Sequence, residues 1–220
     1  MPVQNTLPDP NNTITPGGAD SGTGSVAGPG FSSVSVTSQQ PLIMNRSNSG
    51  LAFKSINKYQ KFTADIKYNA LTKDQFNTVY PFLLQRQASL EAFFVELPQY
   101  GNSNAGTKTI SIPTNEDVAA GSVGLTLNNV NSLEVADMFT ISDPQDSTHV
   151  KTYKITKISG SVVTITPPLQ RKLDHSLGGT RQANFGTPKM RVSVVGPDIQ
   201  YSVDAKGLYS FSVKLEETLS

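Results

Sequence analysis

Few side chains in this 220-residue chain have the types and spacing that catalysis or metal binding requires. The two histidines, His149 and His175, lie far apart, whereas zinc sites use closely spaced Cys or His ligands. Asp174 precedes His175, but adjacent side chains rarely face each other, and no Gly-x-Ser-x-Gly segment supplies a nucleophile. We therefore expect neither a zinc site nor a hydrolytic triad.

The acidic residues give no clearer catalytic pattern. Glu216 and Glu217 are neighbours on a predicted strand, so their side chains point to opposite faces and cannot flank one glycosidic bond. We expect them to form a solvated strand end. Asp137, Asp143 and Asp146 lack the spacing and the glycine of a calcium-binding loop. The sequence predicts that the protein is not an enzyme and uses no metal or cofactor.

Composition excludes further classes. The chain has 18 basic and 17 acidic residues, which argues against specific nucleic-acid binding, because such proteins show a basic excess or patch. No apolar run is long enough for a membrane span, and the first residues lack a signal-peptide pattern. The absence of cysteine fits synthesis in a reducing cytoplasm.

The clearest elements are a strand, a helix and two further strands. Residues 61–68 alternate between apolar and polar side chains, which predicts a half-buried strand. Thr72 and Gln75 have capping-box spacing and predict a helix over 72–87, with a kink or break near Val79 caused by Pro81. Residues 93–97 and 207–219 predict two more strands.

The first seventy residues add a flexible segment and a hairpin. Residues 1–30 contain six glycines and five prolines, which predicts either a flexible tail or an arm that orders against a neighbouring subunit. Strands are expected at 31–36 and 51–68, joined by a polar hairpin loop around residues 45–50.

Residues 102–186 have a different pattern of short strands, at 107–112, 123–128, 138–142, 149–158 and 162–166. This spacing predicts a small β-barrel or sandwich, and residues 168–187 are expected to be a returning linker. The fold class is therefore mainly β with one principal helix. We call residues 31–101 plus 187–220 the frame, and residues 102–186 the insert.

Several segments resemble the baseplate and distal-tail proteins of tailed bacteriophages, which are built on the tail-tube β-fold. In the frame the resemblance lies in Lys61–Ile66 with Leu71–Phe76, in Pro81–Leu84 with Glu91–Pro98, and in Gly207–Phe211 with Glu216-Glu217. In the insert it lies in Val135–Ile141, His149–Ile155 and Thr164–Leu169. The family commonly has Gly-Asp where this chain has Ala136-Asp137.

The resemblance implies a structural virion protein that forms a ring at the distal end of a phage tail and is assembled in the bacterial cytoplasm. Its implied partners are copies of itself and neighbouring tail-tube, hub, wedge or sheath proteins. The insert would project outward and bind such a component. The loop that would reach an adjacent ring contains Met44, Asn45, Arg46, Asn48, Gly50 and Phe53.

A second hypothesis is a receptor- or carbohydrate-binding module at the tail tip, with the insert as the recognition domain. Exposed aromatic side chains in the insert would favour it, and the candidates are Phe139, Tyr153 and Phe185. A wall-degrading enzyme is a third hypothesis, for which the sequence nominates no catalytic residues.

Overall fold

The computed structural model describes residues 6–8, 31–40, 42–56, 60–86, 90–97, 109–113, 117–144, 151–175, 179–186, 188–196 and 198–218. Two six-stranded antiparallel sheets and a two-stranded hairpin contain the described strands. One α-helix accompanies them in this part of the chain. The predicted mainly-β class is confirmed.

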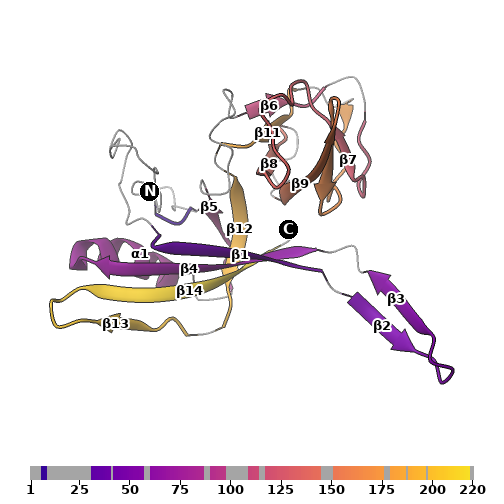
Figure 1. The fold of residues 1–220 in the computed structure, drawn as a ribbon. Helices are drawn as coiled ribbons and strands as arrows, with labels where there is room; N and C mark the ends of the chain where they lie inside the picture. Colours follow the sequence, from indigo (N-terminus) through magenta and orange to yellow (C-terminus); the bar gives the residue numbers. More distant parts are fainter. Residues whose placement is uncertain are drawn as a thin grey trace.

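The frame is built on one sheet with the order β1-β4-β14-β12-β5, to which β13 adds beside β14. The strands are β1 (Ser33–Gln39), β4 (Lys61–Leu71), β5 (Phe93–Glu96), β12 (Lys189–Val194), β13 (Tyr201–Val203) and β14 (Tyr209–Glu217). Both parts of the frame sequence therefore contribute strands to one sheet, with β14 and β12 lying between β4 and β5. β1 and β5 end this order, and β13 forms a further edge beside β14 (Figure 1).

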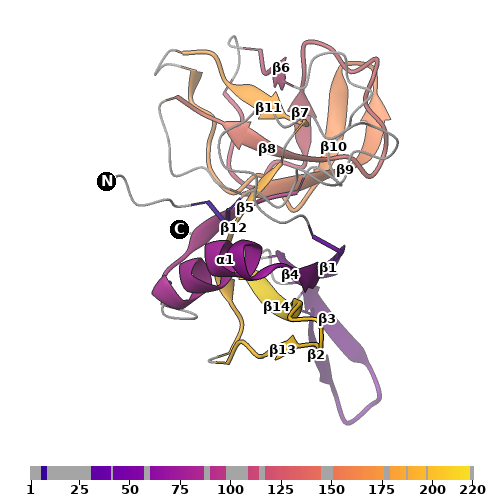
Figure 2. The same cartoon turned by 90° about the vertical axis from the view of Figure 1, so that its left-hand side faces the viewer.

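Helix α1 (Lys73–Gln85) packs on one face of this sheet (Figure 2). The predicted capping box is present: Gln75 N donates to Thr72 Oγ1 at 3.4 Å, and Thr72 N donates to Gln75 Oε1 at 3.0 Å. The predicted break near Val79 is wrong, because the helix continues through Pro81 to Gln85. Pro81 is exposed, so water can reach the carbonyl that lost its intrahelical donor.

The frame core lies between α1 and the sheet. It contains the alternating apolar residues of β4 and β14, together with the buried helix residues Phe76, Val79, Phe82 and Leu83. Leu7 also belongs to this core and is 1% exposed. The predicted flexible tail is therefore wrong for Thr6–Pro8, which pack on the frame of their own chain; residues 1–5 and 9–30 lie outside the described residues.

The insert has its own sheet and its own core. The sheet order is β6-β11-β8-β9-β10-β7. Asn128 N donates to Ser111 O at 3.1 Å, so the two edges of the sheet meet at one point, as in a nearly closed barrel. The strands are β6 (Thr109–Ser111), β7 (Gly124–Thr126), β8 (Met138–Ser142), β9 (Thr152–Ser159), β10 (Val162–Thr166) and β11 (Gln182–Asn184).

The segment 168–187 is not a linker, which corrects the sequence-based prediction. Leu169, Leu173 and Phe185 are buried in the insert core, and β11 lies between β6 and β8 in the sheet. The strand was missed because it has only three residues and a single buried side chain, Ala183. So short a segment gives no readable alternation.

Candidate functional site

The β2–β3 hairpin is the feature that stands furthest apart from both cores. Strands β2 (Leu42–Arg46) and β3 (Ala52–Ile56) pair only with each other among the described strands. The hairpin extends the β1–β4 pair beyond the end of the frame sheet (Figure 1). The expected single strand over 51–68 is thus two strands, β3 and β4. An isolated two-stranded hairpin is marginally stable in water, so this one is suited to gain stability from a partner.

The turn of the hairpin has a defined geometry. Ser47 N donates to Leu51 O at 3.0 Å, and Gly50 N donates to Ser47 O at 2.9 Å. Gly50 has a φ of 79°, a conformation that glycine adopts without strain. This combination of a three-residue loop and a left-handed residue matches the right-handed twist of the two strands. The tip therefore projects in a fixed direction.

Large apolar side chains are exposed on the hairpin. The exposed fractions are 51% for Met44, 64% for Leu51 and 64% for Phe53. Met44 pairs across the hairpin with Lys54, and Phe53 pairs with Asn45. Because paired residues share a face and neighbours alternate, Met44 and Phe53 lie on opposite faces. The hairpin is therefore suited to insert between two surfaces.

The structure places all six predicted loop residues on this hairpin. Met44, Asn45 and Arg46 lie in β2, Asn48 and Gly50 lie in the turn, and Phe53 lies in β3. Leu51 is not among the six predicted residues, although it is as exposed as Phe53. Arg46 and Lys54 are the only charged residues from Leu42 to Ile56, so the hairpin is basic.

A buried polar cluster, here called the junction, joins the insert to the frame. Glu217 of β14 forms an ion pair with Lys151 of the insert, and the two side chains are 1% and 3% exposed. Glu217 also accepts hydrogen bonds from Phe62 N at 3.1 Å and Thr152 N at 3.2 Å. Lys151 Nζ further donates to Gln60 O at 2.8 Å. The expectation that Glu217 is a solvated strand end is wrong.

The alternation along β14 already predicts that Glu217 is buried. This residue continues the alternation of Phe211, Val213 and Leu215, so it lies on the buried face of β14, while Glu216 remains partly exposed and pairs with Lys61 at 2.9 Å. Burial raises the pKa of the Glu217 carboxyl and lowers that of the Lys151 ammonium, against their mutual attraction. The cluster fixes how the insert sits on the frame.

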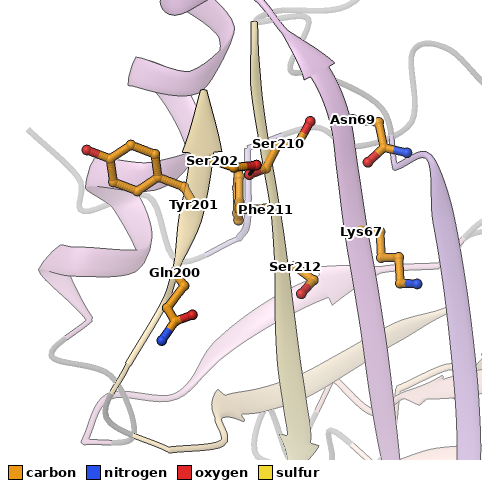
Figure 3. Close-up of a pocket in the computed structure, with 8 residues that line it drawn as sticks. All are labelled: Lys67, Asn69, Gln200, Tyr201, Ser202, Ser210, Phe211 and Ser212. Atoms are coloured by element: carbon orange, nitrogen blue, oxygen red, sulfur yellow. Dashed lines mark hydrogen bonds between the residues drawn. The ribbon is translucent and has the colours of Figure 1, made fainter. Parts of the chain in front are cut away.

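A shallow pocket of about 380 Å³ opens on the frame (Figure 3). Its rim comes from β4, β13 and β14, and the Tyr201 ring points away from it toward α1, where it packs on Phe76 at 5.0 Å. The pocket holds no group with the geometry of a catalytic centre. Its lining residues are Lys67, Asn69, Gln200, Tyr201, Ser202, Ser210, Phe211 and Ser212.

The candidate catalytic and metal-binding residues do not come together. Asp143 pairs with Arg181 (Oδ2 to Nε, 3.0 Å), and Asp137 accepts a hydrogen bond from Glu134 N. His175 N donates to Asp117 Oδ1. Within the described residues no group of three or more metal-ligating side chains exists. His149 and Asp146 lie outside the described residues.

The three aromatic residues that would favour a recognition role for the insert are all 0% exposed. Phe139 stacks on Phe185 with ring centroids 4.8 Å apart, and Tyr153 packs on Phe139 at 5.7 Å. They form the insert core and offer no surface to a sugar. No helix in the described part of the chain has the length and apolar character needed to cross a membrane.

No family model matches this chain, and no curated protein matches it.

Proposed function

We propose that this chain is a structural subunit that assembles into a ring at the distal end of a bacteriophage tail. The proposal unites the sequence resemblance with one observation, the basic hairpin whose two faces expose Met44, Leu51 and Phe53. Exposed apolar side chains on both faces of a narrow element favour contact with neighbouring subunits. The hairpin is the element that would reach the adjacent ring.

The edge strand β1 supports the same function. From Ser33 to Gln39 it contains no charged residue and no proline, although edge strands of monomeric proteins are usually protected by such residues. A ring with rotational symmetry needs two different complementary surfaces on each subunit. The edge strands β1 and β5 of the frame sheet are suited to supply them.

The mechanism is one of assembly. Sheet edges would join subunits around the ring, hairpins would reach the next ring, and the junction would hold each insert at a fixed angle on the frame. A rigid angle matters because a ring repeats any error of orientation in every subunit.

Substituting serine for the three exposed apolar residues of the hairpin tests the proposal. Met44→Ser, Leu51→Ser and Phe53→Ser together should leave the melting temperature nearly unchanged, since none belongs to a core. Association of one ring with the next, measured by light scattering against concentration, should weaken by about tenfold or more, because truncating a central interface side chain costs more than about 1 kcal/mol.

Val135→Ser is the matched control, because Val135 is 59% exposed but lies on the insert. It should leave association unchanged. Equal association of the triple variant and the unsubstituted protein would contradict the role of the hairpin.

A further inference from the structure

The segment Thr6–Pro8 docks on the edge of the frame sheet formed by β5. Thr6 forms a parallel bridge with Phe94, and Leu7 N donates to Phe94 O at 2.8 Å. Leu7 and Pro8 are buried, and Leu7 joins the frame core. The edge of β5 is therefore a receptor for a short extended segment that inserts one leucine, in the manner of strand addition.

The segment that follows residue 30 lies at the opposite edge of the same sheet. Phe31 and Ser32 lead directly into β1, and Ser32 N donates to Lys67 O of β4 at 2.8 Å. The order β1-β4-β14-β12-β5 separates the two edges by four interstrand steps, which is about 19 Å. Residues 9–30 connect the two edges, and a chain of that length reaches up to about 70 Å.

In the proposed ring, β1 of one subunit would lie beside β5 of the next. In that arrangement, Phe31 lies closer to the β5 edge of the neighbour than to the β5 edge of its own subunit. A short intersubunit path raises the effective concentration of the segment at the neighbouring site. The same contacts can form there at no additional cost, as in domain swapping.

We propose that, in the assembled ring, Thr6–Pro8 of each subunit docks on β5 of its neighbour and adds a strand between the two sheets. This inference rests on the proposed ring. It assigns β5 as a binding site whose ligand is a segment of a second copy of this chain. Leu7 is then the side chain that links the core of one subunit to the next.

Disulfide trapping tests this exchange of Thr6–Pro8 between subunits. No native cysteine competes with the introduced ones, because the chain contains none. Thr6→Cys and Phe94→Cys are placed in separate, differently tagged chains that are co-expressed and oxidised after assembly. The bridge between these two positions brings their Cα atoms within the range of a disulfide. Each chain has one cysteine, so a dimer that contains both tags forms only when the segment docks on another subunit.

The expected result is this mixed dimer in the assembled fraction on a non-reducing gel. It should be absent when Asn69→Cys, on the exposed face of β4, replaces Thr6→Cys as the partner of Phe94→Cys. A single chain that carries both Thr6→Cys and Phe94→Cys should then give a ladder of linked subunits.

Two results would overturn the exchange. Assembled rings in which the doubly substituted chain forms only an internal disulfide would show docking within one subunit, while the ring itself would stand. A chain that stays monomeric by light scattering at all concentrations would remove both the ring and the exchange.

Leu7→Ala gives a readout that does not depend on cysteine. With exchange, it should lower the denaturant concentration at which rings dissociate into subunits. A change in subunit unfolding alone, with ring dissociation unaffected, would contradict the exchange.

Discussion

Ala136 holds a backbone conformation that favours glycine. Its φ is 85°, and it lies in a tight turn in which Ala136 N donates to Ile155 O at 2.9 Å and Asp137 Oδ2 accepts from Glu134 N at 2.8 Å. The baseplate and distal-tail proteins that the sequence resembles commonly have glycine at this position, and the turn forms here with alanine in its place. These hydrogen bonds therefore hold a strained residue in place.

Ala136→Gly should stabilise the insert by about 1 kcal/mol. A left-handed conformation costs a non-glycine residue roughly 1–2 kcal/mol. Glycine removes this cost, but it also raises the conformational entropy of the unfolded chain, which offsets part of the stabilisation. Chemical denaturation measures the change. Ala119→Gly, in another turn region but without a positive φ, is the control and should not stabilise. A destabilised Ala136→Gly protein would contradict the strain.

Tyr68 has a buried hydroxyl with no hydrogen-bond partner among the residues that the structure describes. The side chain is 0% exposed, and its ring stacks on Phe211 at a centroid distance of 4.6 Å. Burial raises the pKa of Tyr68 well above its usual value. The ring contributes to the core, whereas the hydroxyl carries an uncompensated desolvation cost.

Tyr68→Phe should therefore keep the fold and raise the free energy of unfolding by about 1 kcal/mol, the lower end of the cost of an unsatisfied buried polar group. Tyr153→Phe is the contrasting variant, because Tyr153 Oη accepts a hydrogen bond from Gln170 N at 3.0 Å. It should destabilise the protein. Loss of stability in Tyr68→Phe would mean that its hydroxyl has a partner.

At the scale of elements, α1 covers one face of the frame sheet, and the edge strands β1 and β5 differ in construction. The β5 edge is covered at Phe94 by Thr6–Pro8, whereas β1 is an edge strand without charge or proline. Natural sheets that remain monomeric usually place lysine or proline at such an edge. The composition of β1 therefore favours an intersubunit role.

Ser35→Lys on β1 should weaken self-association while leaving subunit stability within about 0.5 kcal/mol, as surface substitutions usually do. The lysine introduces a charge at the edge that an added strand would have to accommodate. Ser212→Lys is the control, because Ser212 is exposed on β14 in the interior of the sheet. Sedimentation velocity compares the two variants. An equal effect of both would indicate a contact through the face of the sheet.

The sequence correctly predicted elements whose formation depends on interactions between residues close together in the chain. The capping box of α1 and the bounds of β8 and β10 agree with the sequence analysis, because alternation and capping depend on neighbouring residues. Leu7 on β5 and Lys151 beside Glu217 were not predicted, since both contacts join distant parts of the chain. Six residues of the hairpin were predicted. The exposure of Leu51 was not, because it depends on the division of the predicted strand 51–68 into β3 and β4.

At the scale of the whole molecule, the frame and insert have separate cores and meet at the junction. Lys151 Nζ lies 5.5 Å from the centre of the Phe62 ring in addition to its ion pair, and Gln60 accepts a hydrogen bond from Thr166 Oγ1 at 2.7 Å. A buried ion pair is weak evidence for stability but can specify a unique arrangement. We assign that role to this pair.

A double-mutant cycle on the junction tests this role. Glu217→Gln or Lys151→Met alone should each cost about 3–5 kcal/mol, because each leaves an uncompensated buried charge. The double variant should cost clearly less than the sum, which unfolding experiments report as a coupling energy. Purely additive effects would show that the pair does not act as one unit. Lys172→Met, which removes exposed pairs with Asp117 and Asp174, should destabilise the protein far less than either junction variant.

Cryo-electron microscopy of phage particles, with a search for this chain, tests the proposed location in a tail ring most directly. We expect a closed ring at the distal end of the tail, with the frame stacked on the tube, the β2–β3 hairpin in contact with an adjacent ring and the insert on the outside. Finding the chain only at fibre tips, with the insert facing outward and the hairpin in solvent, would contradict the proposed function.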